Sequence, residues 1–351
     1  SIVIEKSERS NIGKVDFKNL GFGKVFTDHL FEVDYVDGQW QTPKVVPFHN
    51  LSLHPATSFI HYGQTIFEGL KAFKDAQGDI LVFRPKSNWE RMNKSAERVC
   101  MPAIPEELFI GGLDALLKTD QSWFPQDAGT SMYIRPFMFS LDAEIRVRPS
   151  DSYKFMIIIS PSGAYYSEPV KVTVEKHYVR ASNGGLGFAK TAANYAASLL
   201  PAKKAVEKGY HQLIWTDSAE HKYIEEAGTM NFMFVIDGKL ITPQLSDSIL
   251  AGVTRDSIIQ LARDLGVTVE ERKVSVEEVI SALKNGKLQD AFGAGTAATV
   301  SHIIQIAEDG VNYDLPPVEN RDFSNKVADL LNNIKLGKAA DPHNWIHKIK
   351  L

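Results

Sequence analysis

The sequence predicts an α+β protein made of two domains. Its 351 residues are more than one ordinary hydrophobic core accommodates, which favours two domains. Stretches with strand character outnumber those with helix character, and the two do not alternate as regularly as a doubly wound parallel sheet requires. A run rich in proline, serine and glycine, residues 161–169, interrupts the pattern near the middle of the chain.

The elements expected in the first half follow from turn residues, helix caps and apolar runs. Asp75–Gly78 is turn-like and precedes an apolar strand over Ile80–Phe83. Ser87 with Glu90 forms an S-x-x-E capping box, which predicts a helix from there to about Val99. We further expect a helix over Glu106–Lys118 and buried strands over Ser131–Ser140 and Tyr153–Ile159.

The second half is richer in predicted strands. A hairpin over Asn231–Thr242 is indicated by Asp237-Gly238, a pair that readily adopts the positive φ of a tight turn. Strands are expected over Val170–Arg180, Gln212–Thr216, Val267–Val274 and Asp290–Phe292, helices over Asn194–Lys208, Thr254–Leu265 and Val276–Lys284, and further helices in much of the remainder. The predicted division is a smaller domain over 1–161, an interdomain loop over 162–172 and a larger domain over 173–351.

Composition excludes several classes of protein. The 39 basic and 43 acidic residues include no basic block, so no nucleic-acid partner is expected. No apolar run reaches the roughly 18–20 residues of a membrane span, and Ser1–Phe17 lacks the apolar core of a signal peptide. The single cysteine, Cys100, excludes an intramolecular disulfide and a cysteine-rich metal cage. We therefore expect a cytoplasmic protein that acts on small molecules, with no metal site and no membrane partner.

One glycine-rich run superficially matches a dinucleotide-binding fingerprint. Gly293-x-Gly295-x-x-Ala298 follows a predicted strand. In a dinucleotide-binding domain this turn lies near the start of a βαβ unit, with an acidic residue about 20 positions further on. Here Asp309 and Asp314 lie in a turn-rich stretch near the end of the chain, which disfavours that interpretation. The sequence also contains no P-loop, no Gly-x-Ser-x-Gly elbow and no His-Glu-x-x-His helix.

A second glycine-rich run ends in a lysine without acidic neighbours. Gly184, Gly185 and Gly187 precede Lys190, and glycines allow a backbone or a cofactor to approach closely. Desolvation would lower the pKa of such a lysine, as a lysine that forms a Schiff base requires. Taken alone, the segment fits an ordinary surface turn ending in lysine even better.

Three other segments supply chemistry that complements such a lysine. Glu225-Glu226 precede an apolar strand, where one carboxylate facing inward would pair with a protonated pyridine nitrogen, although a solvated loop explains the pair equally well. Thr254 is a plausible N-cap, and the free amides at a helix start bind phosphate. Gly293–Thr296 offers a further glycine-rich turn with a hydroxyl. Together these features match what a phosphorylated pyridine aldehyde requires.

Residues of the first half suggest a place for a substrate carboxylate. In Tyr133-Ile134-Arg135, strand alternation puts the phenol and the guanidinium on one face, where they would receive a carboxylate. An arginine that binds backbone at a strand end fits the spacing equally well. His61–Gly69 is either the wall of a pocket or a connection from helix to strand.

Several motifs, in this order, resemble those of branched-chain aminotransferases, especially the longer subgroup that includes the animal enzymes. They are Phe26–His29, Ile66–Phe73, Phe83–Pro85, Gly129–Pro136, Glu226–Asn231 and Phe292–Ala297. The likeness extends from about Gly21 to Trp345. It implies the fold type IV architecture of pyridoxal 5′-phosphate (PLP) enzymes such as D-amino acid aminotransferase, with a smaller α/β domain, a larger domain with a barrel-like sheet, and a homodimer.

The resemblance also implies roles for individual residues. Lys190 corresponds to the lysine that forms the Schiff base and shuttles the proton. Cofactor contacts are implied for Arg91, Val253, Thr254 and Thr296 at the phosphate, Tyr195 at the phenolic oxygen, Glu226 at the pyridine nitrogen, and Thr229 as a support for Glu226. Substrate contacts are implied for Tyr62, Arg135 and the Thr296-Ala297 turn at the carboxylate end, and for Phe67, Tyr133 and Tyr165 in the apolar side-chain pocket.

The implied reaction transfers the amino group of L-leucine, L-isoleucine or L-valine to 2-oxoglutarate, giving branched-chain 2-oxo acids and L-glutamate. The Cys-x-x-Cys pair of the animal enzymes is replaced by Ala298 and Ser301, so thiol-based control at that place is not expected. A D-amino acid aminotransferase or an aminodeoxychorismate lyase is the nearest alternative, and Phe67-Glu68-Gly69 argues against both. A cofactor- or nucleotide-binding protein without transaminase chemistry is the alternative from another class.

Overall fold

The computed structural model describes residues 1–164 and 168–351, which form two compact units. The first unit contains residues 1–164, Ala189–Ala193 and Ile334–Leu351, and the second contains residues 168–188 and Asn194–Asn333. The chain therefore contributes three separate segments to the first unit. The domain limits expected from the sequence stay a prediction, but the contacts add that the segment around Lys190 belongs to the first unit.

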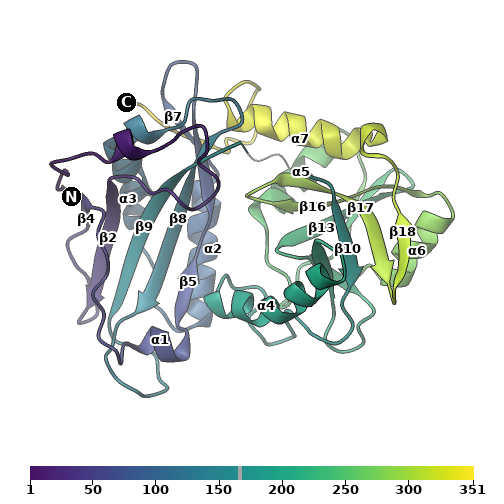
Figure 1. Cartoon of the computed structure of the whole chain (residues 1–351), viewed down its shortest axis with the longest axis horizontal. Helices are drawn as coiled ribbons and strands as arrows, with labels where there is room; N and C mark the ends of the chain where they lie inside the picture. The colour runs from purple at the N-terminus through teal and green to yellow at the C-terminus, as the bar shows by residue number, and fades with distance from the viewer. Residues whose placement is uncertain (165–167) are drawn as a thin grey trace. The chain divides into compact units, whose positions relative to one another are not determined.

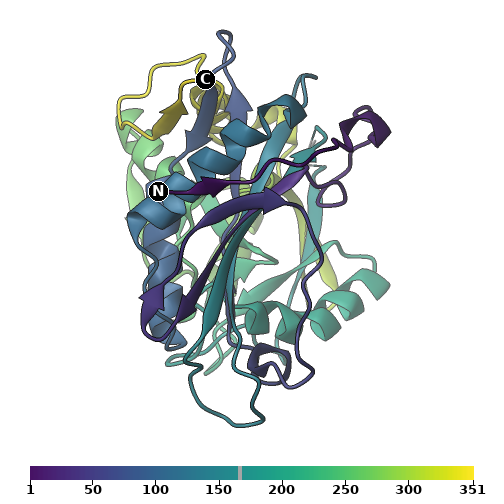
Figure 2. The same cartoon turned by 90° about the vertical axis from the view of Figure 1, so that its left-hand side faces the viewer.

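The first unit is built on a ten-stranded, mostly antiparallel sheet (Figure 2). Its strands are β1 (Val3–Ile4), β2 (His29–Val36), β3 (Gln39–Trp40), β4 (Lys44–Pro47), β5 (Thr65–Phe67), β6 (Leu70–Lys74), β7 (Ile80–Phe83), β8 (Ser131–Ser140), β9 (Tyr153–Ser162) and β19 (Ile346–Ile349). They lie in the order β1-β4-β2-β9-β8-β6-β7-β19, with β3 on β2 and β5 on β8. The helices are α1 (Ser58–Tyr62), α2 (Pro85–Arg98) and α3 (Glu106–Thr119).

Apolar side chains of α2 and α3 pack with those of the sheet to form the core of the first unit. Met92 of α2 and Phe109 of α3 are fully buried with Phe31 of β2 and Phe155 of β9. Helix α3 approaches β2 so closely that a Cβ atom at Gly112 would lie 2.7 Å from the ring of Phe31. Glycine at this position is therefore a requirement of packing rather than of backbone conformation.

The second unit contains a closed ring of strands (Figure 1). Its strands are β10 (Val170–Val174), β11 (Gln212–Thr216), β12 (Ile224–Ala227), β13 (Met230–Ile236), β14 (Lys239–Thr242), β15 (Val269–Glu271), β16 (Leu288–Gly295), β17 (Thr299–Glu308) and β18 (Val311–Asp314). The path β12-β11-β10-β17-β16-β13 returns to β12, because β12 also pairs with β13. This six-stranded closure confirms the expected barrel-like sheet and the α+β fold class.

Helices α4 (Ala192–Glu207), α5 (Val253–Asp264), α6 (Val276–Lys284) and α7 (Asp322–Lys335) complete the chain. Inside the ring, Phe232 and Phe234 stack with ring centres 4.3 Å apart. The fully buried Arg321, just before α7, donates to the carbonyl oxygens of Ala291 and Ile303. It thereby ties the start of α7 to strands β16 and β17.

Several predicted elements are confirmed at both ends, among them Ile80–Phe83, Ser131–Ser140, Gln212–Thr216 and Val276–Lys284. The hairpin turn is confirmed as well, since Asp237 and Gly238 both have positive φ between β13 and β14. Among the residues that the structure describes, no helix is long and apolar enough to cross a membrane.

Two predicted helix caps are wrong. Ser87 is not an N-cap, because α2 begins at Pro85, whose ring pre-sets the first helical residue. Thr254 is not an N-cap either, because Gly252 takes that place and α5 begins at Val253. In both helices the N-cap residue lies before the predicted hydroxyl and makes no side-chain capping hydrogen bond.

Strand lengths and the end of the chain also differ from expectation. The strand predicted over Val170–Arg180 ends at Val174, and the one over Val267–Val274 is reduced to Val269–Glu271. The expectation of helices in much of the remainder is confirmed for α7 but wrong for residues 299–308, which form β17, paired antiparallel with β16. Gly293–Thr296 therefore leads into a hairpin and not into a helix, which excludes the dinucleotide interpretation.

We predict that Gly112→Ala destabilises the protein by about 1–3 kcal/mol, because the added methyl overpacks against the buried ring of Phe31. Gly111→Ala is the matched control. Its Cβ would meet only the Cδ1 atom of Ile2 at 3.6 Å, so the gain in helix propensity, about 1 kcal/mol, should stabilise the helix. Thermal unfolding followed by circular dichroism measures both changes, and equal shifts in the two variants would contradict the prediction.

Candidate active site

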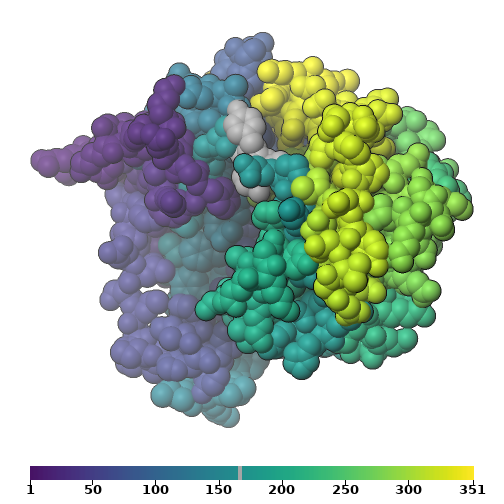
Figure 3. Space-filling view, turned by 45° about the vertical axis from the view of Figure 1, so that its right-hand side comes forward, coloured from purple at the N-terminus to yellow at the C-terminus, as the bar shows by residue number. Residues whose placement is uncertain are grey.

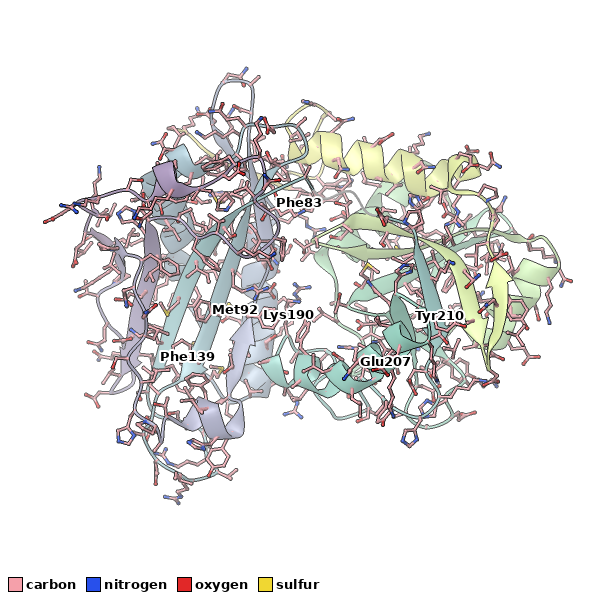
Figure 4. The ribbon with its side chains drawn as sticks, viewed as in Figure 1. Phe83, Met92, Phe139, Lys190, Glu207 and Tyr210 are labelled. Carbon is pink, nitrogen blue, oxygen red and sulfur yellow. The ribbon has the colours of Figure 1, made fainter. Side chains whose placement is uncertain are left out.

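The backbone of Lys190 is held between a helix and a strand of the first unit. Its N–H donates to the hydroxyl of Ser95 on α2 over 2.8 Å, and its carbonyl oxygen accepts from the N–H of Phe67 at the end of β5 over 3.1 Å. Thr191 forms a bridge with Ile66. Figure 4 shows Lys190 close to helix α2, as these bonds require. The direction in which the side chain leaves the backbone is therefore set by two neighbouring elements.

The amine of Lys190 lies in surroundings that disfavour its charged form. Burial lowers the pKa of this amine from 10.5 to about 8, and the positive charge of Arg91 adds to the effect. The negative charge of Glu68 acts in the opposite direction. The amine nitrogen is 4.9 Å from the centre of the Phe67 ring. An amine with this pKa is unprotonated to an appreciable fraction just above neutral pH, as a nucleophile must be.

Beside this lysine, Arg91 forms a bidentate ion pair with a buried carboxylate. The Nε of Arg91 donates to Oε1 of Glu68 over 2.8 Å and Nη2 donates to Oε2 over 2.7 Å. Asn88 donates its side-chain N–H to the same Oε2 over 2.9 Å. Asn88, Arg91 and Ser95 are spaced three and four residues apart on α2 and so share one face of the helix.

Tyr133 and Arg135 lie on one face of β8, as the alternation of the strand predicts. Nη2 of Arg135 donates to the phenolic oxygen of Tyr133 over 2.8 Å, and its guanidinium carbon lies 4.5 Å from the centre of the Phe67 ring. Gly69 is required beside them, because a Cβ there would collide with the hydroxyl of Tyr133. Tyr62, the last residue of α1, is exposed. Phe67, Tyr133 and Arg135 thus form an aromatic surface with a guanidinium packed against it.

In the second unit, Glu226 of β12 forms a buried ion pair with Arg180. Its Oε2 is 2.6 Å from Nε of Arg180, and its Oε1 accepts from the backbone N–H of Leu250 over 3.1 Å. Arg180 is held in turn by the carbonyl oxygens of Gly187 and Ser248, at 3.0 and 2.7 Å. Because only 4% of Glu226 is exposed, its charge depends on this guanidinium rather than on water.

Glu225, its neighbour, faces the other side of the strand. Burial raises the pKa of the Glu225 carboxyl to about 7, although the charge of Arg180 partly offsets this. It lines a separate cavity with Asp217 and Lys273. Strand alternation thus places the two adjacent glutamates in different surroundings. Of the two, Glu226 is the one whose carboxylate forms an ion pair with Arg180.

A cavity of the second unit brings together three of the residues expected at the cofactor, namely Tyr195, Glu226 and Thr229. Its wall consists of Arg180, Asn194, Tyr195, Ser198, Glu226, Gly228, Thr229, Asn231 and Leu250. Asn231 donates to the carbonyl oxygen of Leu250 over 2.9 Å, which ties this loop to β13.

The remaining expected residues lie elsewhere. Val253 and Thr254 begin α5, and Thr296 and Ala297 form the turn between β16 and β17, none of them in the wall of the cavity. Tyr165 lies outside the described residues. Within the residues that the structure describes, no three His, Cys, Asp or Glu side chains are grouped so as to hold a metal ion.

Sequence reasoning assigned no role in the site to four residues that hold its side chains or backbone in place: Glu68, Ser95, Arg180 and Asn231. The spacing of Asn88, Arg91 and Ser95 on one helix face was a usable signal for Ser95. No pattern in the sequence indicated Arg180, because it lies in an irregular stretch between β10 and α4.

Comparison with known proteins identifies the family to which the chain belongs. The model of the family described as amino-transferase class IV matches residues 65–306. The chain belongs to this family. It is 46% identical over 337 residues to branched-chain-amino-acid transaminase 1 of Bacillus subtilis, with 95% of each chain covered. The branched-chain-amino-acid aminotransferase of Mycolicibacterium smegmatis is 41% identical over 340 residues, covering 94% of this chain and 92% of the relative.

Solved structures agree with this assignment. The branched-chain amino acid aminotransferase of Escherichia coli superposes with a TM-score of 0.73 at 25% identity, covering 92% of this chain and 99% of that one. The enzyme of Thermoproteus uzoniensis superposes with a TM-score of 0.73 at 26% identity, covering 91% and 100%. The chain is accordingly an aminotransferase of fold type IV, a group of enzymes that use PLP.

We predict that Arg91→Met raises the pKa of Lys190 from about 8 towards the ordinary lysine value. The substitution removes a like charge and leaves the opposing charge of Glu68 in place, so the ammonium form becomes more stable. The pH dependence of Lys190 modification by a limiting acylating reagent, read by mass spectrometry on the apoprotein, measures the shift. A midpoint that stays near pH 8 or falls would contradict the electrostatic account.

Proposed function

We propose that this aminotransferase is specific for branched-chain amino acids and uses PLP to transfer the amino group of L-leucine, L-isoleucine or L-valine to 2-oxoglutarate. The products are branched-chain 2-oxo acids and L-glutamate. The observation that carries the proposal is the amine of Lys190, whose pKa is lowered to about 8 in a chain 46% identical to a branched-chain transaminase.

The residues present fit the cofactor. The amine of Lys190 would hold the aldehyde end of the cofactor, and the carboxylate of Glu226, which is ion-paired with Arg180, would face the ring nitrogen. Tyr195 lies in the same cavity as Glu226, as a contact to the phenolic oxygen requires. Arg91, Val253, Thr254 and Thr296 would hold the phosphate. When bound, the cofactor supplies a pyridine ring that accepts the electron pair of the substrate Cα–H bond.

Two residues then move or stabilise charge. The amine of Lys190 accepts the proton released from the substrate Cα, and its lowered pKa leaves part of it unprotonated near neutral pH for this purpose. Glu226 would stabilise a positive charge on the ring nitrogen with its carboxylate, which is buried and therefore little screened by water. Arg180 stabilises that carboxylate in turn.

Residues of β5, β8 and α1 suit substrates of two kinds. Phe67 and Tyr133 provide an aromatic surface for a branched aliphatic side chain. Arg135, which lies against both rings, provides a cation for the carboxylate end of the substrate. Tyr62 and Ala297 are proposed at the carboxylate end, and Tyr165 in the apolar pocket. A site that alternates between apolar and acidic substrates needs both surfaces.

We also propose a homodimer in the cytoplasm. Helix α4, whose teal atoms lie at the surface in Figure 3, exposes Leu199, Leu200 and Val206 at 68%, 51% and 60%. A loop of the first unit exposes Ile145 and Val147 at 72% and 82%. Large apolar side chains exposed in groups are typical of surfaces that a partner covers. The single cysteine supports a reducing compartment.

A substrate panel tests the proposal. The protein incubated with PLP and 2-oxoglutarate should form L-glutamate from L-leucine, L-isoleucine and L-valine but not from D-alanine. Borohydride should attach the cofactor covalently to Lys190, and Lys190→Ala should reduce turnover by at least about 100-fold. No turnover of any of the three L-amino acids would reject the substrate assignment, whereas a protein that stays colourless with PLP would reject the cofactor.

The adjacent glutamates of β12 allow a matched comparison. We predict that Glu226→Gln lowers kcat by about 100- to 1,000-fold, because a preorganised charge at the ring nitrogen is lost. Glu225→Gln should leave kcat nearly unchanged, because this side chain lines the other cavity. Steady-state kinetics with L-leucine measures both variants, and similar losses in the two would show that the effect is structural.

A further inference from the structure

We propose that Glu68 is a positioning residue, which fixes the guanidinium of Arg91 as a receptor for the cofactor's phosphate and balances its charge beside Lys190. The inference rests on the proposed function, because it concerns how this chain holds the phosphate and aldehyde ends of PLP.

The contacts of Glu68 determine the plane of the Arg91 guanidinium. Two parallel bonds of 2.8 and 2.7 Å join its carboxylate to Nε and Nη2, and such a bidentate pair allows little rotation. Glu68 is itself fixed by Asn88, which donates to Oε2, and by its own backbone N–H, which donates to the carbonyl oxygen of Pro136 over 2.8 Å. With the Nε–Nη2 edge held, the direction of Nη1 follows from the planarity of the group.

Stability alone does not account for this pair. Glu68 is completely buried and Arg91 is 9% exposed, so both ions lose most of their hydration. The attraction within a buried pair commonly does no more than offset that loss, and apolar residues of similar volume serve as well or better. An orienting role explains why a charged pair occupies this position.

The pair also controls the electrostatic environment of Lys190. Arg91 lowers the pKa of the Lys190 amine and Glu68 raises it, so the two charges act in opposite directions on this group. Without Glu68, the unopposed guanidinium would move the pKa of Lys190 below about 8. Glu68 thus allows Arg91 to lie beside Lys190 without lowering the basicity of the Lys190 amine too far.

Glu68→Gln separates orientation from charge. A simple electrostatic view expects tighter phosphate binding, because the substitution removes a negative charge near the site. If Glu68 positions Arg91, phosphate binding should instead weaken. The amide of glutamine accepts through one oxygen only and turns an N–H donor towards the guanidinium. We expect PLP affinity of the apoprotein to fall about 10- to 100-fold, with the affinity for pyridoxal, which lacks the phosphate, changed by less than about threefold.

Two further variants serve as controls. Asp290→Asn removes a carboxylate from the buried pair with Arg321 in the second unit and should lower the melting temperature while leaving the ratio of PLP to pyridoxal affinity unchanged. Glu68→Asp keeps the charge but shortens the side chain, so the ratio should fall while the pKa of Lys190 stays near its original value. If Glu68→Gln does not fold, Glu68→Asp provides the same comparison of ligands.

Equilibrium dialysis with the two ligands measures the ratio, and calorimetry with inorganic phosphate on the apoprotein gives a second readout free of catalysis. An unchanged ratio, or tighter PLP binding by Glu68→Gln, overturns the positioning role while leaving the proposed function intact. A native protein that binds no PLP at all, or is not labelled at Lys190, overturns the proposed function and this inference with it.

Discussion

The five residues Ala189–Ala193 return to the first unit, and the hydrogen bonds they make there determine which groups surround the amine of Lys190. Ser95 holds the backbone N–H of Lys190, and Phe67 donates to its carbonyl oxygen. Both contacts come from elements of the large antiparallel sheet and its covering helix, so the position of the nucleophile depends on the core of this unit. The lowered pKa follows from that placement, because burial contributes more to it than any single charge.

Buried charges recur as pairs throughout the chain. Glu68 with Arg91, Glu226 with Arg180 and Asp290 with Arg321 each join a largely buried carboxylate to a guanidinium that also lies in the interior. The first two lie beside residues with expected roles in the chemistry, and the third ties the start of α7 to the barrel strands. The first two pairs are completed by an amide that donates to Glu68 and by a carbonyl oxygen that accepts from Arg180, which is the condition under which buried ions are tolerated.

Local patterns predicted much of the fold. The strand over residues 131–140, the hairpin turn at Asp237-Gly238 and helix α6 each follow from periodicity or turn chemistry, which neighbouring residues alone determine. The errors have two causes. Ser87 and Thr254 are not caps because the helices begin one or two residues earlier than the local signals indicate, and element boundaries are the least reliable part of such predictions. Residues 299–308 form a strand because they pair with β16, a long-range contact that local signals do not show.

The sequence by itself determined the family and the candidate lysine, since these depend on the order of the motifs and on the residues that precede Lys190. The strand that turns Glu225 and Glu226 to opposite sides, β12, was found only in the structure. The sequence did not determine which acid neutralises which arginine. Glu68, in the connection between β5 and β6, and Arg91 on α2 are 23 residues apart, and only the packing of α2 on the sheet brings them into contact. The surroundings of each ionisable group were decided by the tertiary structure, because desolvation depends on every segment packed around it.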